Sequence, residues 1–268
     1  MRPFKQLPFA DLPAQPTGAH DFFDLPVERI TVTDDHFGTV TTPCRIVGSG
    51  PPLLLLHGLM TSGYSWRYAA APLSAHFTLY IPDMVGSGEA DMPDVSYAPD
   101  HLADWIGSLL SALDIRGAAA VGNSMGGYLN MRLALRQPDA MGRLVNLHSP
   151  GVPLFRLYAL RTALSLPGSE GLLRWMIGLN VERWVQRNVH YYDESLKSRE
   201  ETAEYSKPLR SRQGVRAFWR ILKETMDPGQ MPAFLDALRG GFPIPLQLLY
   251  AEQDPMVPPI VGDRLRAL

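Results

Sequence analysis

One serine lies in a five-residue pattern typical of an activated nucleophile, Gly122-Asn123-Ser124-Met125-Gly126. An apolar run at 118–121 precedes this pattern and a helix-like stretch follows it, so Ser124 is predicted to occupy a turn between a buried strand and a helix. Such a turn strains the backbone of the serine, which only small neighbours permit, and it exposes the hydroxyl at the edge of the sheet. The same pattern also occurs in plain turns, so its surroundings must decide whether Ser124 is catalytic.

The rest of the chain alternates apolar runs with helical stretches. Apolar side chains recur at helical spacing at Leu102, Ile106, Leu109, Leu110 and Leu113, and again at Tyr128, Met131 and Leu135. Continuous apolar runs, which are typical of strands buried on both faces, occur at 53–56, 77–81, 118–121, 144–147 and 246–250. Before them, two β-rich stretches at 27–32 and 39–47 suggest an antiparallel pair closed by the turn at 48–52. This order predicts an α/β fold with a doubly wound, mostly parallel sheet, which binds ligands at the carboxyl ends of its strands.

Composition narrows the class of protein. The 268 residues are 46% hydrophobic and 19% charged, which suffices for a substantial core, and the net charge of -2 argues against a nucleic-acid partner. No apolar run approaches the roughly 20 residues that span a bilayer, and the first residues lack the apolar centre of a signal peptide. The single cysteine, Cys44, excludes an internal disulfide and is expected to be a small buried hydrophobic residue. We therefore expect a cytoplasmic protein.

Three further motifs follow predicted strands. His57-Gly58-Leu59 follows the run at 53–56, Asp83-x-x-Gly86-Ser87-Gly88 follows 77–81, and Asp254-Pro255 follows 246–250. Together with the turn at Ser124, their order and spacing resemble the α/β-hydrolase family from about residue 27 to the end of the chain. The resemblance implies that Ser124 is the nucleophile, that Asp254 is the acid of a catalytic triad, and that the backbone N–H groups of Leu59 and Met125 form the oxyanion hole.

Other polar residues in these motifs have structural interpretations. In the family, the His-Gly pair after this strand supports the oxyanion loop through hydrogen bonds, so His57 is expected to be structural. Asp83, with the glycines at 86 and 88, is expected to shape the loop beneath the site. Asp254 itself could be a turn former before a proline, but the family places at this point the acid that orients the histidine.

The catalytic base is missing from its expected place. The resemblance implies a histidine roughly 25 to 30 residues beyond the acid, after one more strand, whereas 14 residues follow Asp254. We therefore expect a chain that stops before the last strand, the histidine and the closing helix, and that retains at most residual catalysis. Among the histidines present, only His148 lies at the correct edge of the sheet to substitute, although a histidine that merely lines the pocket is the simpler interpretation.

The predicted domains are an extended arm at 1–26, a core at 27–149 and 241–268, and a helical cap at 150–240 inserted after the sixth strand. Large apolar residues of the cap, Trp175 and Leu179 among them, are expected to form its own core and to cover the site, which favours an apolar substrate. The cap holds fourteen Lys and Arg against ten Asp and Glu. An inward-facing arginine, at Arg187 or in the region of Arg210 and Arg212, could hold a substrate carboxylate.

These observations predict a serine hydrolase, without cofactor or metal, that cleaves a small and largely apolar ester. Because Gly-Asn-Ser-Met-Gly-Gly also resembles the elbow of enzymes that hydrolyse C–C bonds in the products of aromatic ring fission (meta-cleavage), that activity is the alternative. An aspartate at position 124 would instead have implied a dehalogenase or an epoxide hydrolase. A non-catalytic, ligand-binding member of the fold is a third interpretation. No nucleic-acid or membrane-spanning partner is expected, and the sequence does not indicate the oligomeric state.

Overall fold

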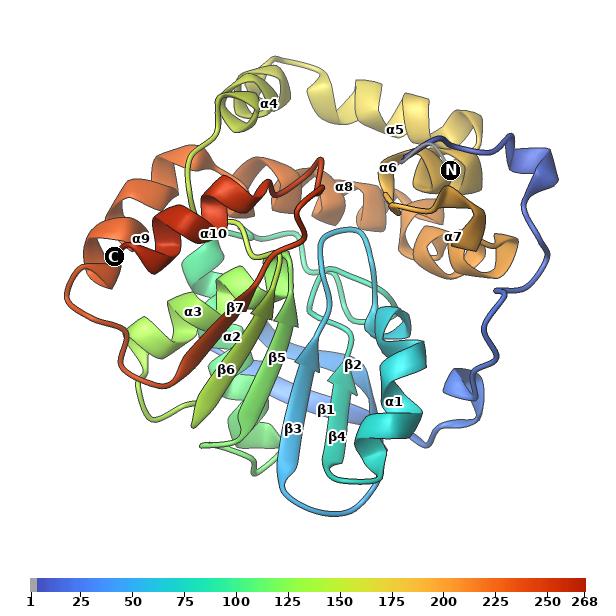
Figure 1. Ribbon diagram of the computed structural model, residues 1–268. Helices are drawn as coiled ribbons and strands as arrows, with labels where there is room; N and C mark the ends of the chain where they lie inside the picture. Colours follow the sequence, from blue (N-terminus) through green and yellow to red (C-terminus); the bar gives the residue numbers. More distant parts are fainter. Residues whose placement is uncertain (1–3) are drawn as a thin grey trace.

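The computed structural model describes residues 4–268, and a seven-stranded sheet lies at its centre (Figure 1). The strand order is β1-β2-β4-β3-β5-β6-β7. The five strands β3 to β7 are parallel to one another, whereas β1 pairs with β2 and β2 with β4 in antiparallel fashion. The strands are β1 (Val27–Asp34), β2 (Gly38–Val47), β3 (Pro52–Leu56), β4 (Thr78–Pro82), β5 (Ala119–Asn123), β6 (Arg143–Leu147) and β7 (Leu246–Leu249). The predicted mostly parallel α/β sheet is thus confirmed.

One detail of the predicted strand pairing is wrong. The turn at 48–52 does not close the antiparallel pair but leads from β2 to β3. The β1–β2 pair closes at 35–37, where Asp34 pairs with Gly38. Gly38 has a φ of 71°, a left-handed conformation that glycine adopts without steric cost.

The two faces of the sheet explain the continuous apolar runs. In β3, Leu54 and Leu56 belong to the core cluster that contains side chains of α2 (Pro99–Ala112) and α3 (Met125–Arg136), whereas Leu53 and Leu55 pack in a second cluster with Tyr64 and Phe22. The short helix α1 (Arg67–Ser74) contributes Ala70 to this second cluster. Because successive side chains of a strand point to opposite faces, a strand covered on both sides must be apolar throughout.

The chain between β6 and β7 is helical. It contains α4 (Phe155–Ser165), α5 (Ser169–Leu179), α6 (Val181–Asn188), α7 (Arg199–Ser206), α8 (Arg212–Arg220) with a π-helical turn at Ile221–Thr225, and α9 (Met231–Leu238). We call this segment the helical insert. Helices α4 to α8 lie beyond the carboxyl ends of the strands (Figure 1). Helix α9 instead packs on the core, where Phe234 meets Tyr128 of α3 edge to face, and α10 (Pro259–Arg266) follows β7.

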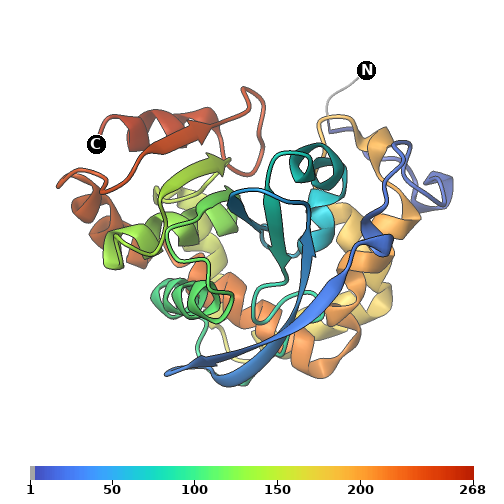
Figure 2. The same cartoon turned by 90° about the horizontal axis from the view of Figure 1, so that it is seen from below.

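Residues 4–26 contain no α-helix or strand and run along the helical insert (Figure 2). Backbone hydrogen bonds join Phe4 N–H to the Tyr192 carbonyl and the N–H groups of Arg199 and Glu200 to carbonyls at Pro13 and Ala14. Farther along, His20 Nε2 lies 2.9 Å from the Glu200 carboxylate. Residues 1–3 of the predicted arm lie outside the described residues.

Helix α5 carries an exposed apolar face that differs from the expected cap interior. Ile177 is buried, but four large side chains spaced three and four residues apart are between 44% and 68% exposed: Leu172, Trp175, Met176 and Leu179. This spacing places them on one side of the helix, and none of the described elements covers that side. Within residues 4–268, no helix is both long enough and apolar enough to cross a bilayer.

Candidate active site

Ser124 occupies a strained turn between β5 and α3. Its backbone has φ 51° and ψ -115°, which non-glycine residues rarely adopt. The Ser124 N–H donates to the Leu147 carbonyl of the neighbouring strand at 2.7 Å, and the Ser124 carbonyl accepts from Tyr128 N–H in α3 at 3.1 Å. A Cβ at Gly126 would lie 2.6 Å from the His57 carbonyl oxygen, and one at Gly122 would lie 2.4 Å from a backbone nitrogen of α3. The glycines are therefore required for helix and strands to approach this closely.

The loop after β3 lies directly against this serine. A Cβ at Gly58 would sit 3.3 Å from Ser124 Cβ. The Gly58 carbonyl accepts hydrogen bonds from His57 Nδ1 at 2.9 Å and from Thr61 Oγ1 at 3.0 Å. Because C=O and N–H point in opposite directions in a trans peptide, these bonds fix the Leu59 N–H on the other side of the Gly58–Leu59 peptide. Among residues 4–268 that N–H has no hydrogen-bond partner.

Met125 provides a second N–H group that has no hydrogen-bond partner among residues 4–268. It is the first residue of α3, so its N–H has no partner within the helix, and the partial positive charge of the helix N-terminus acts at the same place. The structure therefore places both predicted oxyanion donors, Leu59 and Met125, on the backbone segments adjoining Ser124.

His57 and Asp83 have their polar atoms engaged by the protein. His57 is fully buried, with Nδ1 donating to the Gly58 carbonyl and Nε2 accepting from Met84 N–H at 3.0 Å. Burial lowers the pKa of His57, which keeps the ring neutral. Asp83 accepts from the N–H groups of Gly63 and Glu89, each at 2.8 Å. These contacts are those of residues that hold loops in place.

Asp254 follows β7 at the same edge of the sheet. Its Oδ1 accepts from the N–H groups of Met256 at 2.7 Å and Val257 at 2.9 Å, and its Oδ2 lies 3.2 Å from Nδ1 of His148. Burial of the carboxyl opposes its ionisation, but the hydrogen bonds from His148 and from these two backbone groups outweigh burial and lower the pKa of Asp254. The carboxylate is therefore ionised at neutral pH.

The contact between His148 and Asp254 joins the ends of β6 and β7. His148 N–H donates to the Leu249 carbonyl at 2.8 Å, and the side chain is about one-third exposed. The sequence suggested this histidine only through its place directly after an apolar run. Its pairing with Asp254 was not predicted.

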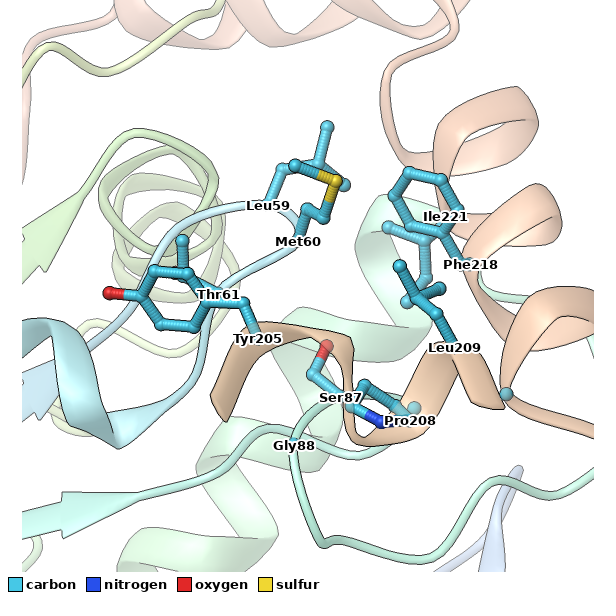
Figure 3. Close-up of a pocket in the computed structure, with 12 residues that line it drawn as sticks. Leu59, Met60, Thr61, Ser87, Gly88, Tyr205, Pro208, Leu209, Phe218 and Ile221 are labelled. Atoms are coloured by element: carbon cyan, nitrogen blue, oxygen red, sulfur yellow. The ribbon is translucent and has the colours of Figure 1, made fainter. Parts of the chain in front are cut away.

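A mostly apolar pocket opens between the oxyanion loop and the helical insert (Figure 3). Leu59 and Met60 line one side, and Leu209, Phe218 and Ile221 of the insert line the other. The enclosed space of this pocket is about 20 Å³, and the rest of the hollow is open to solvent.

The arginines proposed as carboxylate ligands do not line this pocket. Arg210 forms an ion pair with Glu182 at 2.6 Å, and Arg187 and Arg212 are exposed. The arginine that contacts the acid loop is Arg156 of α4, which donates to the Pro255 carbonyl. No local sequence pattern indicated Arg156, since the contact joins segments about a hundred residues apart.

Within the described residues, no group of three or more His, Cys, Asp or Glu side chains is arranged to hold a metal ion.

Comparison with known proteins gives relatives of known activity. This chain is 36% identical to a 2-hydroxymuconate semialdehyde hydrolase of Pseudomonas sp. (strain CF600) over 129 residues. The match covers 47% of this chain and 41% of that enzyme. A structure of a meta-cleavage product hydrolase, CumD, matches with a TM-score of 0.69 at 25% identity, covering 92% of this chain and 87% of that one.

Longer matches and a family model complete the comparison. The chain is 33% identical over 228 residues to an uncharacterised protein of Mycobacterium tuberculosis. The match covers 80% of this chain but only 64% of that protein, so the chain spans less than two thirds of the relative's length. A putative α/β hydrolase from Nostoc sp. PCC 7120 shares the fold, with a TM-score of 0.71 at 21% identity, covering 90% of this chain and 86% of that one. The model of the α/β hydrolase fold matches residues 51–268, and the chain therefore belongs to the α/β-hydrolase fold family.

Proposed function

We propose that this protein is a serine hydrolase that cleaves small, largely apolar carboxylic esters, with Ser124 as nucleophile and Asp254 as the acid that orients the base. The observation that carries the proposal is the strained backbone of Ser124, next to the N–H groups of Leu59 and Met125, which have no hydrogen-bond partner among residues 4–268. Backbone strain of this kind costs on the order of 1–3 kcal/mol and persists only where the surrounding structure enforces it.

The chemistry follows from this arrangement. Ser124 Oγ attacks the ester carbonyl, and the oxygen that becomes negatively charged is stabilised by the N–H groups of Leu59 and Met125. The C–O bond of the ester then breaks, the alcohol leaves with the proton taken from Ser124, and an acyl-enzyme remains. Water attacks this acyl group in the same way and releases the carboxylic acid.

The pocket indicates the substrate class. Its walls consist mainly of apolar side chains, and Leu209, Phe218 and Ile221 come from the segment 150–240, which we propose acts as a cap over the site. The acyl or alcohol part of the ester would pack against these residues. Shortening Phe218 to leucine is therefore expected to shift the preferred chain length of p-nitrophenyl esters toward longer acyl groups.

A second candidate is hydrolysis of a C–C bond in a vinylogous diketone. It is favoured by the sequence Gly122 to Gly127, whose likeness to the elbow of ring-fission-product hydrolases agrees with the 36% identity to an enzyme of that description. The same nucleophile and oxyanion donors would serve either substrate.

The two candidates are separated by assay. A fluorophosphonate probe should label Ser124, and Ser124→Ala should abolish both labelling and turnover, whereas Ser74→Ala on the outer face of α1 should change neither. Turnover of p-nitrophenyl butyrate and of a ring-fission diketone is then compared by kcat/KM. Labelling of a different serine in the wild-type chain would overturn the assignment of Ser124.

A further inference from the structure

The outer side of helix α5 is apolar and carries no charged residue. At 3.6 residues per turn, its four exposed apolar side chains cover an arc of about 100°. The two charged residues of the helix, Glu170 and Arg174, lie outside that arc, and Glu170 is 3.2 Å from Arg216 of α8. A Cβ at Gly171 or Gly178 would meet nothing within 4 Å. A surface helix ordinarily has the reverse arrangement, with its polar side toward water.

Helix α4, which touches α5, repeats this arrangement. Its two arginines are engaged by the protein, since Arg156 donates to the Pro255 carbonyl and Arg161 Nε lies 3.1 Å from Asp227 Oδ2. Three large side chains of this helix and its C-terminal end are instead between 49% and 87% exposed: Phe155, Tyr158 and Leu166. We call these three, together with the four of α5, the α4–α5 patch. The two helices lie at the end of the molecule away from the sheet (Figure 1).

The charge around the α4–α5 patch is positive. Residues 155–190 contain five arginines and two glutamates. Both glutamates form ion pairs, Glu170 with Arg216 and Glu182 with Arg210. By contrast, two exposed arginines spaced four residues apart on α6 form no ion pair with any of residues 4–268: Arg183 and Arg187. Helix α6 begins two residues after the patch ends, so these positive charges border it.

This combination fits an anionic lipid surface. Trp, Phe, Leu and Met side chains enter the boundary between headgroups and acyl chains, and arginines beside them attract anionic headgroups. A second copy of the chain fits less well. A symmetric contact through the same patch would bring Arg183 and Arg187 of both copies to one interface, and the nearby glutamates are already paired.

The distribution of charge over the whole chain agrees with this choice. Segment 150–240 carries a net charge of +4, so the total of -2 leaves -6 on the remaining residues. With the α4–α5 patch on the membrane, the positive insert faces the anionic surface and the negative sheet domain is directed away from it (Figure 1).

We propose that this protein docks on anionic membrane surfaces through the α4–α5 patch, with Arg183 and Arg187 beside the lipid phosphates. The inference goes beyond the proposed ester hydrolysis and does not depend on Ser124. Docking brings the helical insert, which supplies one wall of the apolar pocket, to the layer in which apolar esters dissolve.

Co-sedimentation of the 268-residue chain with vesicles tests the docking. The wild type should bind vesicles made of equal parts phosphatidylcholine and phosphatidylglycerol, and this binding should weaken as salt is added. Trp175→Glu and Leu179→Glu should each weaken it by about tenfold or more, because lost apolar burial and the added negative charge both oppose docking. Val27→Glu is the matched control. Val27 is 49% exposed and lies on β1, so this variant should bind within about twofold of wild type.

The arginines are tested by their lipid preference. Replacing Arg183 and Arg187 by glutamine should weaken binding to the anionic vesicles by about fivefold for each arginine, and should leave the weaker binding to pure phosphatidylcholine unchanged. Equal losses on both kinds of vesicle would refute the contact with lipid phosphates. All substituted side chains are exposed, so thermal unfolding of the variants should match wild type.

Tryptophan fluorescence tests whether the α4–α5 patch itself enters the lipid. Trp175 is 62% exposed, whereas the other four tryptophans are buried or half-buried. Brominated phosphatidylcholine should therefore quench part of the fluorescence of the bound wild type. Trp175→Phe should still bind but should lose this quenching. Equal quenching of Trp175→Phe and wild type would place a different surface on the membrane and overturn the proposal.

Two further outcomes would overturn the docking. One is that the wild type does not bind the anionic vesicles, or that Leu179→Glu binds them equally well. The other is a lipid-free dimer, seen by sedimentation equilibrium, that Leu179→Glu separates while vesicles are not bound, which would assign the α4–α5 patch to a second copy. Ser124→Ala should bind vesicles like wild type, so failure of the proposed hydrolysis would leave this test unaffected.

Discussion

Replacing Ser124 by glycine should make the protein more stable while it removes activity. For a residue with a Cβ, the φ of 51° destabilises the folded state by on the order of 1–3 kcal/mol, and this strain is absent in glycine. Glycine loses about 0.5–1 kcal/mol more chain entropy on folding than alanine does. Because the Ser124 hydroxyl has no hydrogen-bond partner among residues 4–268, its removal costs little. The net gain is about 1.5 kcal/mol.

Ser124→Ala is the matched control, because it removes the same hydroxyl but keeps the Cβ that causes the strain. At about 2–4 °C per kcal/mol for a protein of this size, the Tm of Ser124→Gly should exceed that of Ser124→Ala by about 3–6 °C. Scanning calorimetry on both variants and wild type measures the difference directly. A Tm for Ser124→Gly equal to or below that of Ser124→Ala would refute the strain argument, whatever the activities are.

Three further predictions concern neighbours of the elbow. Because contacts hold the folded pKa of Asp254 below 3.8, they stabilise the protein above that pH and are lost on acidification. The stability difference between wild type and Asp254→Asn in urea titrations should thus be constant from pH 7 to 5 and narrow below about pH 4; a constant gap down to pH 3 would contradict this. Burial lowers the pKa of His57 below 6.5, so unfolding takes up a proton as pH falls. Stability should then decline from pH 7 to 5 by at most about 1.4 kcal/mol per pH unit, and His57→Gln, though less stable, should lack this component. A Cβ at Gly127 would lie 2.0 Å from Ser149 Oγ, so Gly127→Ala should cost about 1–3 kcal/mol; Ser149→Gly in the same chain should recover part of it, and no recovery would place the clash elsewhere.

The central strands could be predicted because apolar side chains cover them on both faces. The segment Leu53 to Leu56 is apolar throughout because its alternate residues enter two different core clusters. The resulting run of four apolar residues can be recognised in the sequence. The strained turn at Ser124 was also readable, since glycines at 122 and 126 are required by backbone atoms only 2.4–2.6 Å from where a Cβ would lie. In both cases the constraint acts within a few residues along the chain.

The missed features depend on contacts between distant segments. His148 meets Asp254 because β6 and β7 are adjacent in the sheet, although 98 residues of chain connect the two strands. The outward face of α5 has the apolar spacing of a buried face, so no local pattern distinguishes Trp175, which is 62% exposed, from Ile177, which is 1% exposed. The contact of Arg156, rather than Arg210, with the acid loop was missed for the same reason, because it joins segments that are distant in the sequence.

Hydrogen bonds between the N-terminal segment and α7 connect residues 13–20 to a wall of the apolar pocket. Hydrogen bonds reach from Pro13, Ala14 and His20 to the start of α7, and Tyr205 near the end of that helix lines the pocket. A fusion partner or purification tag ahead of this segment is therefore expected to disturb a wall of the pocket. Kinetic constants should be measured with and without the tag before substrates are ranked. Hydrogen exchange at the amides of α7 would register the disturbance, and unchanged exchange would show that the tag is harmless.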